Sequence, residues 1–121
     1  MRDRVRFKIL FYRDAGGRCQ ACEYAREMQG HHRAKADKCF QALAEYGPEI
    51  PDDYGRHLGE GIWELRIAIG HHQHRFLYVF CREKVLVTNA FLKKSRKVPE
   101  SEIETAKRRL ADWRDRFHHE I

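Results

Sequence analysis

The sequence has no apolar run that approaches the ~20 residues of a membrane-spanning helix, and charged residues make up 35% of it. Its first residues, Met1-Arg2-Asp3-Arg4, lead into a short alternating segment instead of the apolar core of a secretory signal. It also lacks repeats, low-complexity stretches and linkers. These absences argue against membrane and secreted proteins. We expect a cytoplasmic chain whose 121 residues form a single domain, 1–121, with one core.

Cysteine is scarce, and its placement does not suggest a disulfide scaffold. There are four cysteines, Cys19, Cys22, Cys39 and Cys81, in a chain long enough to build a hydrophobic core. Disulfide scaffolds are typical of small secreted chains that lack such a core. Cys39 falls on an apolar helical stripe and Cys81 ends an apolar strand, where cysteine behaves as a small hydrophobic residue. We predict that all four are reduced.

The pair Cys19-x-x-Cys22 and the following His31-His32 are a candidate zinc site, because two thiolates and two imidazoles bind zinc tetrahedrally. Adjacent histidines on a helix point in different directions, however, and structural zinc sites usually join two short-spaced ligand pairs across a longer loop. We therefore predict no metal and no cofactor, with zinc as the less favoured alternative. The run His71-His72-x-His74 at a hairpin tip is expected to be exposed to solvent.

Acidic residues are depleted in the segment 61–99. That segment has 8 Lys/Arg against only Glu64 and Glu83, so its balance of +6 equals the formal net charge of the whole chain. Localised positive charge predicts a polyanionic partner whose phosphates would dominate the affinity. The alternative is a solvated, lysine-rich loop without any partner.

Hydrophobic periodicity predicts an α+β fold with the element order β-α-α-β-β-β-α. The expected elements are a strand at 5–12, helices at 19–29 and 33–46, strands at 62–69, 74–81 and 85–91, and a final helix that begins near Pro99. The stretch from Gly47-Pro48 to His57 is interpreted as irregular and polar. The three later strands form an antiparallel meander, and we expect the helices on one side of this antiparallel sheet.

Strand alternation assigns the two faces of the predicted sheet. The apolar face forms the core and consists of Trp63, Leu65, Ile67, Ile69, Phe76, Tyr78 and Phe80. The opposite face carries Glu64, Arg66, Ala68, Arg75 and Leu77. With a four-residue turn at Gly70–Gln73, Arg66 and Arg75 become diagonal neighbours, roughly 7–8 Å apart at the backbone. Two neighbouring arginines repel each other unless a bound anion lies between them or Glu64 pairs with them.

Residues 54–67, Tyr-Gly-Arg-His-Leu-Gly-Glu-Gly-Ile-Trp-Glu-Leu-Arg-Ile, resemble the Y-x-K-x-L-x-x-G-(L/I)-(W/F)-E-L-R signature of HigB-like toxins. The resemblance continues through residues 74–78 and 91–95, and residues 98–106 are similar to the family's T-P-x-x-E-I-x-x-A helix start. Each motif alone is weak, but the ordered set covers nearly the whole chain. The chain thus resembles the phage-derived, HigB-type branch of the RelE/ParE superfamily of type II toxin–antitoxin systems.

This resemblance implies a RelE-like, microbial-RNase-like fold with an N-terminal helical hairpin and a C-terminal helix. It also implies a metal-independent endoribonuclease that cleaves ribosome-bound mRNA through attack of a 2′-hydroxyl on the adjacent phosphate, with guanidinium groups stabilising the charge that develops. The implied catalytic residues are Arg66, Arg75, Lys93 and Lys94. The implied RNA-binding residues are Arg56, His57, Arg96 and Lys97. The implied partners are mRNA, the ribosome and a cognate helix-turn-helix antitoxin, and no membrane.

The departures from the family pattern concern proton transfer. Many relatives have His-Gly-Phe where this chain has Asn89-Ala90-Phe91, so a possible histidine acid or base is absent there. His57 is a candidate replacement, although a surface role is favoured. Two other functions stay open. One is gyrase inhibition of the ParE type, against which the arginine–lysine set argues, and the other is a non-enzymatic RNA-binding module.

Overall fold

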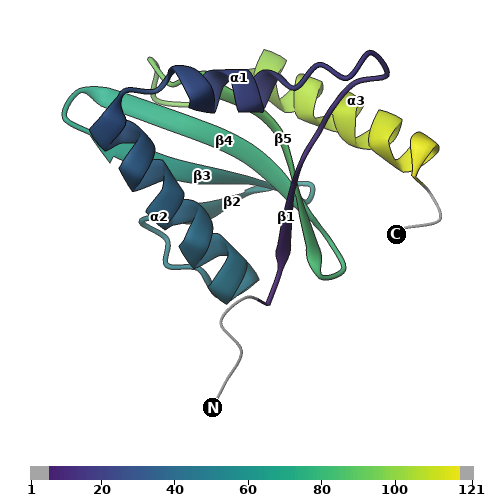
Figure 1. Ribbon diagram of the computed structural model, residues 1–121, viewed down its shortest axis with the longest axis horizontal. Helices are drawn as coiled ribbons and strands as arrows, with labels where there is room; N and C mark the ends of the chain where they lie inside the picture. Colours follow the sequence, from purple (N-terminus) through teal and green to yellow (C-terminus); the bar gives the residue numbers. More distant parts are fainter. Residues whose placement is uncertain (1–5, 118–121) are drawn as a thin grey trace.

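A five-stranded, mostly antiparallel sheet carries helices on both of its faces in the computed structural model, which describes residues 6–117 (Figure 1). Its elements are β1 (Lys8–Phe11), α1 (Gln20–Glu27), α2 (Gly30–Tyr46), the 3-10 turn η1 (Gly47–Glu49), β2 (Gly55–Gly59), β3 (Ile62–Ile69), β4 (His72–Cys81), β5 (Lys84–Leu92) and α3 (Glu100–Arg116). The predicted α+β class is confirmed. The expected start of the first strand, Val5, lies outside the described residues. Within residues 6–117, no helix is long and apolar enough to cross a bilayer.

The sheet differs from the predicted one at both edges. Its strand order is β1-β5-β4-β3-β2, and β1 runs parallel to β5. The strand β2 falls in the stretch that was expected to be irregular, because its residues, Gly-Arg-His-Leu-Gly, show no apolar alternation. The pairing of β2 with β3 rests on backbone hydrogen bonds and on the close packing of Gly55 against Ile50 and Tyr78. A Cβ atom on Gly55 would lie 2.5 Å from Ile50 and 2.8 Å from the Tyr78 hydroxyl, so only glycine fits there.

The helices divide between the two faces, which corrects the expectation that they share one side. The face covered by α1 and α2, here called the helical-hairpin face, buries Leu43, Leu65, Ile67, Phe76 and Tyr78 among others. The face covered by α3, here called the α3 face, buries a second cluster. Its helical members are the predicted stripe Ile103, Ala106, Leu110, Trp113 and Phe117. Strands β1, β3, β4 and β5 each supply both clusters because successive side chains point to opposite faces.

The hairpin between β3 and β4 is tighter than expected. Ile69 pairs with His72, so the turn contains only Gly70 and His71, and Gly70 has a φ of 57°. The register therefore differs from the predicted one by two residues, and Arg66 pairs directly with Arg75 instead of diagonally. A shift of two residues leaves every side chain on its predicted face. The face assignment is confirmed although the register was wrong.

Candidate nucleic-acid interface

Three adjoining grooves surround Arg66 and together are lined by all eight predicted site residues. The lysine groove, of about 700 Å³, is lined by Arg66, His71, Arg75, Lys93 and Lys94 among others. The loop groove, of about 400 Å³, includes Arg56, His57, Glu64, Arg66, Lys93, Arg96 and Lys97. The tyrosine groove, of about 370 Å³, includes Lys35, Asp53, Tyr54, Arg66, Gln73 and Arg75. Residues from β2, β3, β4 and the segment after β5 therefore converge on one arginine.

Glu64 lies between the two arginines of the sheet. Its Oε1 atom is 3.2 Å from Nε of Arg75, and its Oε2 atom is 3.7 Å from Nε of Arg66. The contact with Arg75 is an ion pair that falls short of an aligned hydrogen bond. On β2, Arg56 stands opposite Glu64 in the strand register. Of the two alternatives for the arginine pair, the structure shows the pairing with Glu64, and one carboxylate facing several guanidinium groups leaves an excess of positive charge.

Arg75 is buried, although the face assignment placed it on the side away from the predicted core. Only 2% of its surface is accessible. Its Nη1 atom donates to the carbonyl oxygen of His74 (3.0 Å), and Nη2 donates to Oε1 of Gln73 (3.2 Å). Burial lowers the pKa of Arg75, and the neighbouring Glu64 opposes this shift. Arg75 is thus a fixed charge behind the groove surface, and both of its terminal nitrogens already donate hydrogen bonds.

Arg66 is the accessible member of the pair. Its side chain is 29% exposed, and its Nη1 atom donates a long hydrogen bond to the carbonyl oxygen of Asp52 (3.4 Å). Its backbone N–H donates to the carbonyl oxygen of Tyr54 (2.7 Å), which ties this position to the chain entering β2. An exposed guanidinium held by fixed neighbours is suited to bind an oxyanion.

The predicted lysines follow β5 in the segment that leads to α3. Lys93 lines both the lysine groove and the loop groove, and its N–H donates to the carbonyl oxygen of Gln73 (2.8 Å). Lys94 faces the lysine groove, while Arg96 and Lys97 are exposed and line the loop groove. The basic charge seen in the sequence is therefore gathered beside Arg66 in space.

His57 and Asn89, the two positions tied to proton transfer, lie in different surroundings. The ring of His57 packs on Trp63, with 5.1 Å between ring centroids, on an exposed part of β2. Asn89 is buried on the α3 face, where Nδ2 donates to Oε1 of Glu102 (2.8 Å) and Oδ1 accepts from the Thr88 hydroxyl (2.6 Å). Asn89 thus anchors the first turn of α3.

A chain of imidazoles lies on the helical-hairpin face. Nδ1 of His32 and Nε2 of His74 are 2.8 Å apart, and Nδ1 of His74 is 2.7 Å from the Tyr24 hydroxyl. The ring of His72 stacks on that of His74. Burial lowers the pKa of both His32 and His74, and their charged neighbours add to the shift. The expectation that His74 is solvent-exposed was wrong, because α1 and α2 cover this end of β4.

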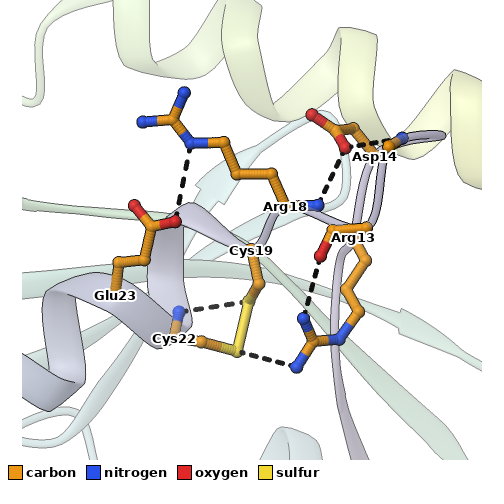
Figure 2. A network of polar contacts seen from close by, with 8 residues as sticks. Arg13, Asp14, Arg18, Cys19, Cys22 and Glu23 are labelled. Atoms are coloured by element: carbon orange, nitrogen blue, oxygen red, sulfur yellow. Dashed lines mark hydrogen bonds and ion pairs between the residues drawn. A yellow bond between two sulfur atoms is a disulfide. The ribbon is translucent and has the colours of Figure 1, made fainter.

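The cysteine pair at the start of α1 is joined by a disulfide, which corrects the prediction that all four cysteines are reduced. Figure 2 shows the Cys19–Cys22 bond with the guanidinium of Arg13 beside it, and Nη2 of Arg13 lies 3.9 Å from Sγ of Cys22. Cys19 also caps α1, because its Sγ accepts from the backbone N–H of Cys22 (3.1 Å). Cys39 and Cys81 are free and buried as predicted.

The alternative zinc ligands do not come together. His32 bonds with His74, while Cys19 and Cys22 bond with each other. Over residues 6–117, no group of three or more His, Cys, Asp or Glu side chains is arranged to hold a metal ion.

Another groove, of about 610 Å³, lies between the chain before α1 and α3. It contains none of the predicted site residues. Two of its polar residues bond within the fold, since the Tyr12 hydroxyl donates to Asp112 (2.7 Å) and Arg109 donates to the carbonyl oxygen of Thr88 (2.9 Å).

Tyr54 and Gln73 are groove residues that the sequence reasoning did not assign. Both line the tyrosine groove, next to Arg66 and Arg75. Tyr54 is the first residue of the segment 54–67 that carried the family resemblance, so a signal for it was present. Gln73 had no such signal, because its place depended on the turn length of the hairpin.

Residues 23–111, well over half of the chain, match the family described as "Phage derived protein Gp49-like (DUF891)". The chain belongs to the Gp49-like family. This membership supports the broader part of the resemblance, a family of toxin–antitoxin toxins, while the HigB-type branch stays a prediction. No curated protein matches the chain.

Proposed function

We propose that this Gp49-like protein is the toxin of a type II toxin–antitoxin system and that it cleaves mRNA on the ribosome. The observation that carries the proposal is the convergence of all eight predicted residues on grooves around Arg66. Family membership supports the toxin assignment. The excess of arginine and lysine over carboxylates in the three grooves supports a polyanionic ligand.

The proposed reaction is a transesterification within the RNA chain. The 2′-oxygen forms a bond to the adjacent phosphorus while the bond from phosphorus to the 5′-oxygen breaks. The 2′-hydroxyl gives up a proton and the departing 5′-oxygen gains one, which leaves a 2′,3′-cyclic phosphate and a 5′-hydroxyl. Negative charge grows on the non-bridging oxygens during this step, so fixed cations next to them accelerate it.

The residues take different parts in this reaction. Arg66 is placed against the phosphate because it is accessible and is held by Glu64 and the carbonyl of Asp52. Arg75, buried behind it, supplies a fixed charge and holds Glu64. Lys93 and Lys94 position the flanking phosphates or transfer the protons, and Arg56, Arg96 and Lys97 bind the RNA backbone along the loop groove.

A cognate antitoxin with a helix-turn-helix domain is the proposed partner that silences this activity, by covering or distorting the basic grooves. Because the target is translating mRNA, the proposed site of action is the cytoplasm.

The proposal is tested by brief induced expression followed by mapping of mRNA 5′ ends. The expected result is new ends within translated codons, which disappear in Arg66→Ala and persist in Arg26→Ala, an exposed arginine of α1 outside the three grooves. Unaltered mRNA together with blocked DNA replication would contradict the proposal in favour of gyrase inhibition. Unaltered mRNA with normal replication would contradict both toxin mechanisms and favour a non-enzymatic RNA-binding module.

A further inference from the structure

The tyrosine groove adjoins the proposed phosphate site and differs from the other two grooves in its lining. All three grooves contain arginine or lysine side chains, but of the three only this one is also lined by a tyrosine ring. Its lining includes Tyr54, Asp53, Ala68 and Gln73 in addition to Lys35 and the arginine pair. A phosphate needs no aromatic surface, so this composition points to a different part of the ligand.

Tyr54 is held in place yet open to solvent. Its N–H donates to the carbonyl oxygen of Pro51 (2.9 Å), and its own carbonyl oxygen accepts from the N–H of Arg66 (2.7 Å). Its exposure is 40%, and the other exposed large hydrophobic residues within 6–117 are Tyr46 (42%) and Leu92 (36%). The backbone of Tyr54 is thus fixed next to Arg66, while its ring stays open to a ligand that binds beside the arginine.

The polar groups around the ring are also fixed. Nζ of Lys35 donates to the carbonyl oxygen of Ala68 (2.6 Å), and Oε1 of Gln73 accepts from Nη2 of Arg75 (3.2 Å). Gln73 therefore connects this groove to the buried arginine of the proposed active site. An aromatic surface next to amide and carboxylate groups fits a planar heterocycle whose edge carries both hydrogen-bond donors and acceptors.

We propose that the tyrosine groove is a subsite for one unpaired nucleobase of the RNA, which stacks on Tyr54. The base belongs to a nucleotide that flanks the phosphate held at Arg66. This inference rests on the proposed function, because it takes the phosphate at Arg66 as its reference point. Stacking requires a base that is not paired with another strand, so the substrate class is single-stranded RNA, and contact through the ring face makes the subsite tolerant of base identity.

The test is single-turnover cleavage of a short mRNA on programmed ribosomes. Two further mRNAs each lack the base at one of the two nucleotides that flank the scissile phosphate. The protein is used as wild type, Tyr54→Ala, Tyr54→Phe and Tyr46→Ala, the last being a tyrosine of matching exposure outside the three grooves. Circular dichroism establishes that each variant is folded.

We expect Tyr54→Ala to slow cleavage of the intact mRNA by about 5- to 150-fold, the range for loss of one stacked base. Tyr54→Phe keeps the ring and should cleave at the wild-type rate, as should Tyr46→Ala. Removal of one flanking base should slow the wild-type protein to the same degree and abolish the difference between wild type and Tyr54→Ala. The subsite can be tested even if Tyr54→Ala does not fold. In that case the wild-type protein alone should cleave the intact mRNA faster than one of the base-lacking mRNAs.

The subsite is overturned, with the proposed function intact, if the wild-type protein cleaves all three mRNAs at one rate. It is overturned equally if Tyr54→Ala slows the intact and base-lacking mRNAs by the same factor. If the wild-type protein cleaves no mRNA on the ribosome, the proposed function fails and the subsite fails with it.

Discussion

The two faces of the sheet are built by the same strands yet differ in chemistry. On the helical-hairpin face, Ile67 and Phe76 pack under α1 and α2 with buried imidazoles beside them. On the α3 face, the next residues along, Arg66 and Arg75, share the carboxylate of Glu64. The α3 helix packs mainly on β5, so the β2–β3 part of its face borders the grooves around Arg66. Incomplete cover by α3 thus gives the basic residues access to a ligand, whereas burial under the hairpin lowers the pKa values of His32 and His74.

Of the substitutions that distinguish the two faces, loss of the Glu64 carboxylate should have the largest effect, because this group neutralises the buried Arg75. Glu64 is 3% and Arg75 is 2% exposed. We expect Glu64→Gln to lower the free energy of unfolding by about 3–5 kcal/mol, because it leaves a buried guanidinium without a counter-charge. Urea unfolding followed by tryptophan fluorescence measures the change.

The double variant Glu64→Gln with Arg75→Gln should recover part of this loss, because no uncompensated charge then stays buried. Glu60→Gln is the matched control, since it removes a solvent-exposed ion pair with Lys107, and it should leave stability unchanged. If Glu64→Gln unfolded with the same free energy as the wild type, the Glu64–Arg75 ion pair would not stabilise the α3 face.

Removal of Arg66 should separate activity from stability on the α3 face. We expect Arg66→Ala to lower the rate of mRNA cleavage about 10²- to 10³-fold, the usual effect of losing one group that stabilises an oxyanion. The thermal midpoint should stay close to wild type because this side chain is partly exposed. Cleavage by Arg66→Ala at the rate of Arg26→Ala would remove Arg66 from the proposed active site.

Reduction of the Cys19–Cys22 disulfide should have a smaller effect on stability. This bond lies at the start of α1, which covers the helical-hairpin face. Its cysteines are separated by only three positions, so the chain-entropy account limits its contribution to about 2 kcal/mol. We expect a reductant to lower the thermal midpoint of the wild type by a few degrees and to leave Cys22→Ser unaffected. Equal midpoints with and without reductant would contradict a stabilising role for this bond.

The smallest effect should be a pH dependence that arises on the helical-hairpin face. The folded pKa values of His32 and His74 lie below the ~6.5 of the unfolded chain, chiefly because of burial. The unfolded state therefore binds more protons in acid, and stability falls as the pH drops below ~6.5 toward the folded values. The groups facing these rings are Tyr24, His31, His72 and Arg75, none of them acidic.

Thermal midpoints between pH 7.5 and 5.5 measure this dependence. His74→Asn should reduce the slope, whereas His71→Ala, an exposed turn residue, should keep it. An unchanged slope in His74→Asn would assign the pH dependence to other groups.

Local patterns predicted the parts of this fold that depend on near neighbours. Alternation placed Glu64, Arg66 and Arg75 on one face and Tyr78 on the other, and the helical periodicity of α3 was confirmed. The errors came from non-local features. The strand β2 has no apolar pattern and exists through its pairing with β3, and β1 joins β5 from the far end of the chain.

The candidate site was predicted as a set of residues but not as an arrangement. The eight residues that charge patterning and the family resemblance predicted all line the three grooves, whereas Tyr54 and Gln73 were not assigned. The burial of Arg75 was missed because it depends on a two-residue turn that sets Arg66 directly opposite and on Gln73 as a hydrogen-bond acceptor. The disulfide was missed because the reasoning rested on chain size and expected compartment, whereas Cys19 and Cys22 meet within one turn of α1.

We propose that RNA bound in the basic grooves of the α3 face is cleaved through attack of its own 2′-hydroxyl. The most direct measurement uses purified protein and programmed ribosomes carrying an mRNA with one 2′-deoxynucleotide immediately 5′ of the scissile phosphate. We predict that cleavage at that position is lost, while the all-ribose mRNA is cut to give a 2′,3′-cyclic phosphate and a 5′-hydroxyl. Continued cleavage at the deoxy position would contradict the proposed mechanism.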